Sequence, residues 1–407
     1  MSTSQINGSR CISLFSGAGG LDIGFERAGF STVSLCELEP QFAETLRQNQ
    51  GWPHSDGHRY FADATILQND IREVDAEQLT HGETIDCVLG GPPCQAFSSS
   101  GKQKSVLDPR GTLVSQFVRI VDEVRPKSFL FENVRGIVTA RDQNGRPGGV
   151  VRKIISDFEE LGYSCRAGLL NAADYGAFQR RVRCFIIGVQ HGVAPQFPET
   201  THVAPTAKGR GLFELPWRTL SEFLVESADV DEANHVFPTA ALGPQLAELP
   251  NGTGLKSRGV AEPTRPGGHW GYRQGTFIAD LDLPARTVTG SGSQDWVRWN
   301  GTLRRLTLLE VKRLQGFPDD WSFAGTKADV FKQVGNAVPT LFGELLARTI
   351  QSHLSDNLRT PPVRLGFPAE FEKYINYTIS DHRRNESARK VHLPFVQAAQ
   401  SGDTGRG

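Results

Sequence analysis

Short apolar, β-branched runs alternate with amphipathic helical stretches over the first half of the chain. The runs that predict strands span residues 11–15, 33–37, 85–89, 128–131 and 184–189. Between them, apolar residues recur at helical spacing over residues 21–28, 41–49, 112–124 and 149–161. This alternation predicts βαβ units that build a mainly parallel sheet, with ligands at the carboxyl ends of its strands.

The pattern changes after His191, where Pro and Gly become frequent and long helical patterns fade. Residues 252–301 are rich in glycine with scattered arginines, which predicts a second, irregular domain. Helical spacing returns over residues 306–314 and 340–354. We therefore expect the chain to return to the first domain in this region.

The end of the chain, from about Ser355, carries two adjacent prolines, the basic run His382-Arg383-Arg384 and a glycine-rich finish. Its apolar content is thin outside Phe371, Tyr374 and Ile375. A segment with few apolar residues buries too little surface to offset the entropy that ordering costs. We expect a peripheral tail that is partly ordered at most.

Composition sets the broad class of the protein. The 407 residues are 38% hydrophobic and 22% charged, which is ordinary for a soluble protein with two domains. No segment approaches the ~20 apolar residues of a membrane span, and the polar start lacks a signal-peptide core, so we expect a cytoplasmic protein. The six cysteines include no Cys-x-x-Cys pair, which argues for reduced thiols and against structural zinc. With a formal net charge of -1, any DNA-binding surface needs locally concentrated basic groups.

Cys94 stands in the sequence Gly90-Gly91-Pro92-Pro93-Cys94-Gln95-Ala96-Phe97-Ser98, directly after a predicted buried strand. Each proline fixes its own φ and favours extended geometry in the residue before it, so the turn has little backbone freedom. We therefore expect the Cys94 thiol to be presented and not packed, which favours a chemical role. The other five cysteines fall in apolar strand-like runs, where a thiol usually behaves as a small inert apolar group.

The segment Phe15-Ser16-Gly17-Ala18-Gly19-Gly20 follows the first predicted strand and opens a helix. Glycines there let the backbone approach a ligand, and a helix N-terminus favours negative charge. The segment fails the dinucleotide pattern, because Asp22 stands where Gly-x-Gly-x-x-Gly needs its third glycine. Glu37 ends the second strand, the usual place of a carboxylate that binds ribose hydroxyls, so a nucleoside-containing cofactor is favoured. The alternative is a tight strand-to-helix turn with a surface glutamate.

Further polar groups lie at the ends of two other predicted strands. Glu132 follows a buried strand, where poor solvation should raise its pKa and suit it to hydrogen bonding with a bound base. Before the strand at Cys184, Arg181 and Arg183 point to one face and Arg180 to the other, so one of these sets could enter a cleft. The alternatives are a glutamate that caps a turn and a basic run that lies in solvent.

These motifs occur in a fixed order with three others. The additional ones are Arg304-Arg305-Leu306-Thr307 through Glu310, Arg313-Leu314-Gln315-Gly316-Phe317-Pro318, and Gln333-Val334-Gly335-Asn336-Ala337-Val338-Pro339. Together with residues 15–20, 91–98, 132–134 and 179–183, they closely resemble the DNA (cytosine-5) methyltransferases of bacterial restriction-modification systems. The resemblance covers roughly residues 10–190 and 303–354.

The resemblance implies an α/β fold with four parts. A Rossmann-like sheet of the S-adenosylmethionine-dependent methyltransferases is expected over residues 1–190, and a smaller, irregular target-recognition domain over residues 191–302. Residues 303–354 would return to the catalytic domain, and residues 355–407 would form the peripheral tail. We expect a monomer.

S-adenosylmethionine, with no metal, is the cofactor that the resemblance implies. The contacts it implies are Phe15 near the adenine, Gly17, Ala18, Gly19 and Gly20 at the methionine part, Glu37 at the ribose, Leu38 on one adenine face and Asp70 at the adenine amino group. Ile71 and Pro93 are expected in the same pocket, which Asn336 would close. Leu38 stands where the family often carries an aromatic ring, so we expect softer stacking on the adenine.

The resemblance also implies the groups that act on the base. Cys94 matches the nucleophile, Glu132 the residue that engages cytosine N3, and Arg183 the group on the O2 side of the base, with Arg181 beside it. Residues 95–113 match a mobile loop that closes on DNA. The expected DNA contacts are Gln95, Ser98 and Ser100 in this loop and Arg258, Arg273 and Arg298 in the second domain.

The chemistry explains why these residue types occur together. Carbon 5 of cytosine is too weak a nucleophile to attack a methylsulfonium, and thiolate addition at carbon 6 builds the missing electron density. The base must leave the duplex to be reached, so double-stranded DNA is the expected partner. A cognate restriction endonuclease would be a functional partner, since methylation would protect host DNA from it.

Three other functions stay open from the sequence. The nearest is a transfer-RNA cytosine-5 methyltransferase, which can share the Pro-Pro-Cys-Gln signature, although the long variable domain favours duplex DNA. A catalytically silent DNA-binding protein is disfavoured because Cys94, Glu132, Arg183 and the glycine loop are all present. A nicotinamide oxidoreductase is disfavoured by the missing third glycine.

Overall fold

The computed structural model describes residues 8–53, 57, 59–93, 112–205, 214–227, 234–255, 276–356 and 358–391. Its centre is a seven-stranded sheet in the order β5-β2-β1-β6-β7-β9-β8. Neighbouring strands are parallel, except that β9 runs antiparallel to both β7 and β8. The strand bounds are β1 Arg10–Leu14, β2 Ser31–Glu37, β5 Thr65–Gln68, β6 Cys87–Gly90, β7 Ser128–Val134, β8 Ser164–Asn171 and β9 Val182–Val189.

The five strands predicted from the sequence correspond to β1, β2, β6, β7 and β9, which confirms the α/β class. The two edge strands, β5 and β8, were not predicted. β5 is short and only half-buried, so it shows no continuous apolar run. β8 includes a glycine, Gly168, at which a Cβ would lie 2.5 Å from the Phe197 ring. A close approach of this kind cannot be seen in the local pattern.

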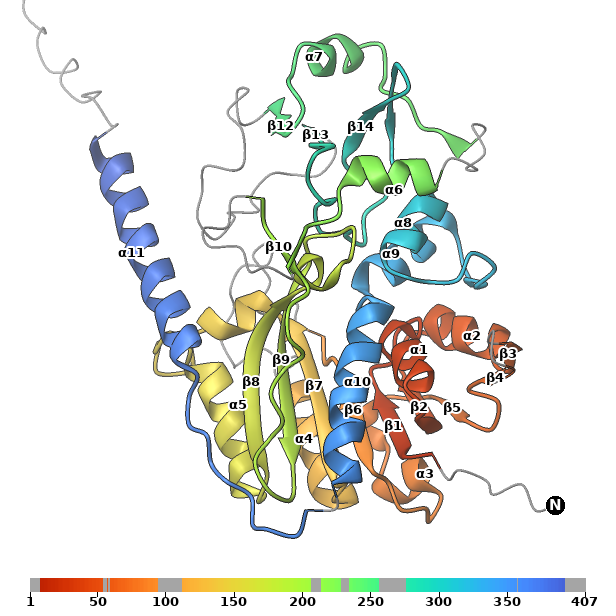
Figure 1. Cartoon of the computed structure of the whole chain (residues 1–407), viewed down its shortest axis with the longest axis vertical. Coiled ribbons are helices and arrows are strands. Elements are labelled where there is room, and N and C mark those ends of the chain that lie inside the picture. Colours follow the sequence, from red (N-terminus) through yellow and green to blue (C-terminus); the bar gives the residue numbers. More distant parts are fainter. Residues whose placement is uncertain are drawn as a thin grey trace, which may run out of the picture.

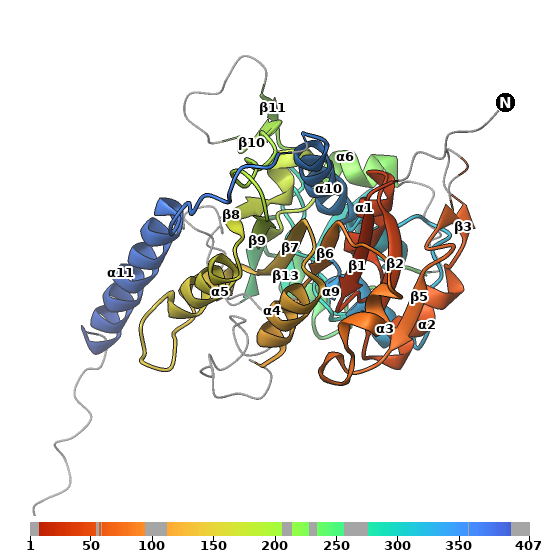
Figure 2. The same cartoon turned by 90° about the horizontal axis from the view of Figure 1, so that it is seen from below.

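Helices cover both faces of the sheet (Figure 1; Figure 2). Side chains along β7 alternate between the faces: Phe129 and Phe131 belong to a cluster with α4 and α5, and Leu130 belongs to one with α1 and α10. A parallel sheet covered on both faces favours strands that are mostly apolar, as in the segments Val88–Leu89 of β6 and Phe129–Phe131 of β7. The helix bounds are α1 Gly20–Arg27, α2 Pro40–Gln48, α3 Ala76–Thr80, α4 Thr112–Val124, α5 Gly149–Glu160 and α10 Thr340–Ser355.

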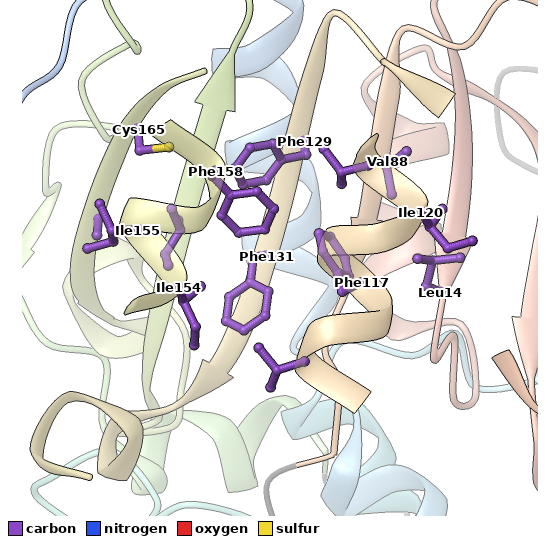
Figure 3. Close-up of a cluster of buried hydrophobic side chains, with 14 of the residues drawn as sticks. Leu14, Val88, Phe117, Ile120, Phe129, Phe131, Ile154, Ile155, Phe158 and Cys165 are labelled. Carbon is purple, nitrogen blue, oxygen red and sulfur yellow. The ribbon is translucent and has the colours of Figure 1, made fainter. Parts of the chain in front are cut away.

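Aromatic rings fill the space between β7, α4 and α5 (Figure 3). The Phe129 and Phe158 ring centroids lie 4.0 Å apart, and the Phe117 and Phe131 rings meet edge to face at 5.4 Å. Aromatic pairs in such geometry contribute about 0.5–1.5 kcal/mol beyond the burial of their surface. This cluster lies directly behind the carboxyl end of β7, which it holds in place.

The chain returns to the first domain through contact between α1 and α10. A Cβ at Gly24 of α1 would lie 2.3 Å from the backbone nitrogen of Glu344 in α10. A Cβ at Gly343 of α10 would lie 2.3 Å from the carbonyl oxygen of Leu21. The two glycines thus let the helix backbones touch, which places the start of α10 beside the glycine loop that opens α1.

The middle of the chain contains short strands and helices. β12, β13, β14 and β15 form a four-stranded sheet, and β10 and β11 pair in parallel. Two small apolar clusters hold this region, one around Phe223 and Val297 and one around Trp296. The bounds are β10 His202–Val203, β11 Leu215–Pro216, α6 Leu220–Glu226, α7 Gly243–Ala247, β12 Thr253–Gly254, β13 Phe277–Ile278, β14 Trp296–Trp299, β15 Thr302–Arg305, α8 Leu308–Leu314 and α9 Lys327–Asn336.

Several short elements lie between the main strands and helices. A hairpin beside α2 consists of β3 and β4, and in the described part of the chain turns of 3-10 helix follow β5, β7 and β8. Trp52 of this hairpin stacks on Tyr60 with a centroid distance of 5.5 Å. The bounds are β3 Trp52–Pro53, β4 Arg59–Tyr60, η1 Ile71–Glu73, η3 Arg135–Thr139 and η4 Ala172–Tyr175.

The end of the described chain is a long helix, α11 (Ala369–Val391). Phe371 and Ile375, two of the three apolar residues noted in the tail sequence, are buried in the main core cluster, and Tyr374 packs against it. The tail is therefore anchored at this point. In the described part of the chain, no helix combines the length and apolar character that crossing a membrane would require.

Candidate active site

The carboxyl ends of β1, β2, β6 and β7 meet at one edge of the sheet, as expected for parallel neighbours. Predicted site residues stand at three of these strand ends: Phe15 after β1, Glu37 at the end of β2 and Glu132 within β7. The motif that contains the predicted residues Pro93 and Cys94 begins with Gly91, directly after β6. Because Gly90 pairs with Phe131, the residue after β6 lies beside Glu132. The structure thus brings the motif around Glu132 and the Gly-Pro-Pro turn together.

Gly91 is a glycine for a steric reason. A Cβ at this position would lie 2.5 Å from Glu132 Oε2, well inside contact distance. The Asn133 side-chain amide donates a hydrogen bond to the carbonyl oxygen of Pro92 at 3.2 Å. These two contacts fix the turn to the end of β7. Pro93, predicted in the cofactor pocket, is exposed at the end of this turn.

The described cysteines are all buried: Cys11, Cys36, Cys87, Cys165 and Cys184. Burial raises the pKa of both Cys36 and Cys87 to about 12, so these thiols stay protonated at neutral pH. A thiol without its ionised form is a poor nucleophile, which leaves them structural roles. The predicted nucleophile Cys94 lies outside the described residues, as do Gln95, Ser98 and Ser100.

Glu132 and Arg183 form a buried ion pair, with Arg183 Nε 3.1 Å from Glu132 Oε1. Antiparallel pairing of β7 and β9 sets Arg183 opposite Val134, which brings its side chain to Glu132. Burial raises the pKa of Glu132 above its ordinary value, and the charges of Arg183 and Arg181 offset part of that rise. A carboxyl group in this state can exchange a proton with a base bound beside it.

Arg181 has a different position from Arg183. Its side chain is fully buried, and its guanidinium donates hydrogen bonds to the carbonyl oxygens of Val288 at 2.8 Å, Gly335 at 2.9 Å and Ala337 at 2.7 Å. Burial lowers the pKa of this guanidinium. Arg181 therefore joins the start of β9 to two distant segments while its charge still acts on Glu132.

Local sequence patterns did not point to the amide groups that surround Arg181. Gln179 is fully buried, donates to the Gln315 side chain at 2.9 Å and accepts the backbone N–H of Val288 at 2.8 Å. Gln315 donates to the carbonyl oxygen of Ala337 at 3.1 Å. Both glutamines stand in motifs that the resemblance covers, and this was the one signal that could have marked them.

On the cofactor side, the glycine loop closes onto Glu37. The backbone N–H of Gly17 donates to Glu37 Oε2 at 2.8 Å, and that of Glu39 donates to Oε1 at 2.9 Å. Burial raises the pKa of Glu37, and the backbone N–H groups of Glu39 and Gly17 oppose that rise. Phe15 has a left-handed backbone with φ 57°, which is uncommon for a bulky residue and marks a constrained position.

The surroundings of this loop fit a nucleoside-containing cofactor. Apart from the residues next to it in the chain, no described residue has an atom within 4 Å of the place where a Cβ on Gly17 would stand, so these residues leave open space beside the loop. Leu38, predicted on one adenine face, is 56% exposed next to the buried Glu37. An apolar surface beside a buried carboxylate suits a base and its sugar hydroxyls. In the described residues, no cluster of three or more His, Cys, Asp or Glu could hold a metal ion.

Asp70 and Ile71 lie where β5 ends. Asp70 caps η1 by accepting the backbone N–H of Arg72 at 3.0 Å, and its carboxylate also forms an ion pair with the Arg72 guanidinium. This pairing lowers the pKa of Asp70. Ile71 is buried. The carboxylate thus already has a partner, and its contact with an adenine amino group stays a prediction.

Asn336 ends α9, and its side chain is exposed. The residues on either side of it, Gly335 and Ala337, are carbonyl acceptors of Arg181. Arg181 therefore connects the base side of the site to the segment that was predicted to close the cofactor pocket.

Asp22, which stands where a dinucleotide-binding loop would have its third glycine, is a buried acidic residue. It is 1% exposed, and neither of its oxygens accepts a hydrogen bond of normal geometry from the described residues. Burial raises the pKa of Asp22 to about 7, although the Ser13 hydroxyl lies near enough to favour the ionised form. Its place in the first turn of α1 puts this carboxyl directly behind the glycine loop.

The predicted DNA contacts in the second region are described only in part. Arg298 donates hydrogen bonds to the carbonyl oxygens of Leu246 at 2.7 Å and Ala247 at 2.9 Å, and to Asn251 Oδ1 at 3.1 Å. These contacts cap the end of α7, so its guanidinium supports this region, and DNA contact by Arg298 stays a prediction. Arg258 and Arg273 lie outside the described residues.

Comparison with known proteins agrees with the motifs. A family model for the C-5 cytosine-specific DNA methylases matches residues 9–352. The chain is 32% identical to the Type II methyltransferase M.FnuDI of Fusobacterium nucleatum, over 85% of this chain and 95% of that protein. It is 33% identical to the Type II methyltransferase M1.HphI of Haemophilus parahaemolyticus, over 83% and 86%.

A solved structure shows the same fold. The Entamoeba histolytica methyltransferase EhMeth superposes with a TM-score of 0.58 and 17% identity, over 85% of this chain and 99% of that one. The family model spans most of the chain, and both relatives are matched over nearly their whole length. The resemblance seen in the motifs is confirmed: the chain belongs to the C-5 cytosine-specific DNA methylases and is a DNA cytosine-5 methyltransferase.

Proposed function

We propose that this chain transfers a methyl group from S-adenosylmethionine to carbon 5 of a cytosine flipped out of double-stranded DNA, through a covalent adduct with Cys94. The observation that carries the proposal is the buried Glu132–Arg183 pair, which lies against the Gly91-Pro92 turn that leads to Cys94. The cofactor loop opens at the same edge of the sheet.

The base side would act as follows. The Cys94 thiolate adds to carbon 6, and the electrons of the 5,6 double bond become available at carbon 5, which takes the methyl group. Glu132, whose pKa burial raises, shares a proton with N3 and so stabilises the charge that builds up on the ring. Arg183 holds Glu132 and binds the O2 side of the base, with Arg181 fixed behind it. Loss of the carbon 5 proton restores the double bond and expels the thiolate.

The cofactor supplies the methyl group as a sulfonium. Glu37, held by two backbone N–H groups, keeps acceptor capacity for ribose hydroxyls, and Leu38 offers its exposed apolar surface to the adenine. Phe15, the residue 17–20 loop, Asp70, Ile71, Pro93 and Asn336 complete this pocket in the proposal. Both reactants then meet above the carboxyl ends of β1, β2, β6 and β7.

The partner is double-stranded DNA, and residues 191–302 are the part that selects its sequence. Their support is compositional: arginines and aromatic residues interleave with glycines over residues 252–301, which suits contacts to base edges and phosphates. The two relatives compared above are Type II methyltransferases, and we extend that role to this chain as protection of host DNA from a cognate endonuclease.

Methylation mapping tests the proposed function. Plasmid DNA from cells that express the protein is treated with bisulfite and sequenced, beside DNA from cells that express Glu132→Gln. We expect protected cytosines at one short sequence with the wild-type protein and few or none with the variant. Purified transfer RNA serves as a second substrate: transfer of labelled methyl groups to RNA and not to DNA would contradict the proposal.

A further inference from the structure

The helix α11 lies beyond the part of the chain that the family model matches. That match ends at residue 352, whereas α11 comprises Ala369–Val391. The features of α11 therefore do not follow from membership of the family. Its contacts and its charge give it a role of its own.

The first turns of α11 are attached beside the active site. Phe371 and Ile375 are buried in the cluster that contains the η3 turn. The Arg135 guanidinium lies 5.6 Å from the centroid of the Tyr374 ring. Since η3 begins directly after β7, these contacts hold α11 at the edge of the sheet where Glu132 lies.

A second set of contacts fixes the direction of the helix. Arg152 of α5 forms an ion pair with Glu372 and lies over the Phe367 ring at 3.6 Å. Gly148, before α5, has φ 71°, and a Cβ there would lie 2.4 Å from Ile375 Cδ1. Contacts from two sides with so little free space leave one orientation for the first half of α11.

The second half of α11 extends past these contacts. Among the α11 side chains that the structure describes, Ile379 is the last that packs against the core cluster. Both views show the helix standing apart from the other elements, and in Figure 1 it rises on the same side of the sheet as the second region (Figure 1; Figure 2). The twelve residues from 380 to 391 span about 18 Å at the rise of an α-helix.

The charge of α11 changes along its length. The first half contains Glu370, Glu372 and Lys373, a net charge of -1. Residues 381–391 contain four basic and two acidic residues, a net charge of +2. The basic residues are Arg383, Arg384, Arg389 and Lys390. The acidic end is thus the attached end, and the basic end extends outward.

We propose that residues 380–391 of α11 bind the phosphate backbone of the duplex that flanks the methylated site. The inference rests on the proposed function, which brings duplex DNA to the edge where α11 is attached. Lysine and arginine bind phosphates without regard to base sequence. Residues 380–391, which we call the arm, therefore add affinity and not specificity. A length of about 18 Å covers about five base pairs of flank.

Charge reversal in the full-length protein tests the arm, which consists of residues 380–391. We compare wild type with Arg383→Glu/Arg384→Glu, and measure the Kd for duplexes that carry the mapped site with flanks of different length on each side. We expect the variant to bind the long duplex about tenfold more weakly. The slope of log K against log salt should fall by about two units, one for each phosphate that the arm no longer neutralises. On a duplex trimmed on the side of the arm, both proteins should bind equally.

A matched control carries the same change of net charge at the opposite edge of the sheet. Arg10→Glu/Lys127→Glu alters two residues at the amino ends of β1 and β7, both on the surface. We expect it to bind the long duplex like wild type. The arm is contradicted if the two variants behave alike, if the loss is the same on trimmed and long duplexes, or if α11 variants change the oligomeric state and not DNA affinity. Methylation by the α11 variant would persist in each case, which separates this result from failure of the proposed function.

Discussion

Glu37 and Glu132 are both buried carboxyls at the same edge of the sheet, but the protein holds them in opposite ways. Backbone N–H groups of residues close in sequence or in the adjoining loop hold Glu37. Arg183, carried in by an antiparallel strand, holds Glu132. The first arrangement needs only a loop and a strand end. The second depends on the whole return of the chain, because Arg181 ties β9 to carbonyl groups of residues 288–337.

The different partners of Glu37 and Glu132 suit the two carboxyl groups to different functions. Burial raises the pKa of both carboxyls, but the fixed backbone donors of Glu37 favour its ionised form, which suits binding of neutral hydroxyl groups. At Glu132, burial raises the pKa and the nearby arginine charges lower it. A carboxyl group balanced in this way can gain or lose a proton, which suits a group that acts on a base. We therefore expect substitutions of Glu37 to affect cofactor binding and those of Glu132 to affect the chemical step.

The largest expected effect is that of Glu132→Gln. The amide cannot share a proton with N3 as the carboxyl group does, so we expect kcat to fall about 10²–10³-fold. Binding of S-adenosylmethionine, measured by calorimetry, should stay within about twofold of wild type. Loss of cofactor affinity in proportion to the loss of kcat would remove the proposed division between the two glutamates.

The second prediction is that Arg181 and Arg183 differ in their effects on stability and on kcat. Arg181→Lys leaves some of three buried carbonyl groups without a donor, and we expect a loss of about 2–4 kcal/mol in the free energy of unfolding. Arg183→Lys keeps a positive charge beside Glu132, and we expect a loss below about 1 kcal/mol but a clear fall in kcat. Urea unfolding and methyl-transfer assays of both variants provide the comparison, and equal destabilisation would contradict it.

Glu37→Gln should have a smaller and different effect. The amide keeps one acceptor oxygen for the loop N–H groups but loses the charge that we propose binds ribose hydroxyls. We expect the Kd for S-adenosylmethionine to rise about tenfold while kcat at saturating cofactor changes little. The readouts are calorimetry and initial rates over a range of cofactor concentrations. A fall in kcat at saturating cofactor as large as that of Glu132→Gln would contradict the separate roles proposed for the two glutamates.

The smallest effect concerns Asp22, behind the glycine loop, and it depends on pH. Burial raises its pKa to about 7, so the native state holds a proton that the unfolded chain releases nearer pH 4. The contribution to stability is fully present below that lower value and is lost as pH rises through about 7. Asp22→Asn cannot ionise, so its stability relative to wild type should increase by about 2.5 kcal/mol between pH 5 and pH 8. A constant difference in urea unfolding across this range would contradict a buried Asp22 carboxyl with a raised pKa.

The contrast between contacts close in sequence and contacts between distant segments explains which features the sequence could predict. β1, β2, β6, β7 and β9 were predicted because strands buried on both faces are rich in apolar and β-branched residues. Phe15 and Glu37, proposed on the cofactor side, stand at the ends of β1 and β2, where local pattern pointed to them. Asp70 and Asn336 were indicated only by the family resemblance, and the cofactor contacts of all four residues stay predictions. Gln179, Gln315 and the acceptors of Arg181 could not be predicted, because the bonds from Gln179 to Gln315 and from Arg181 to Val288 and Gly335 each join residues more than a hundred positions apart. Asp22 was missed because an acidic residue in the first turn of a helix usually lies in solvent, and the local pattern does not show that this one is buried.

Arg298 shows the limit of composition as a guide. An arginine among glycines and aromatic residues is typical of a DNA-binding surface, yet its guanidinium caps α7. The tail shows the reverse case. Its few apolar residues, Phe371, Tyr374 and Ile375, fall on one side of a helix and attach it to the core, which the low average apolar content concealed.

Identification of the cysteine that bonds to the base tests the central claim most directly. Wild-type protein is incubated with S-adenosylmethionine and duplex DNA that carries 5-fluorocytosine at the mapped site. The fluorine cannot leave as a proton does, so the adduct persists in denaturant and can be digested for mass spectrometry. We expect the modified pyrimidine on the peptide that contains Cys94 and no adduct with Cys94→Ala. An adduct on any of the five buried cysteines, or equal trapping of Cys94→Ala, would contradict the account.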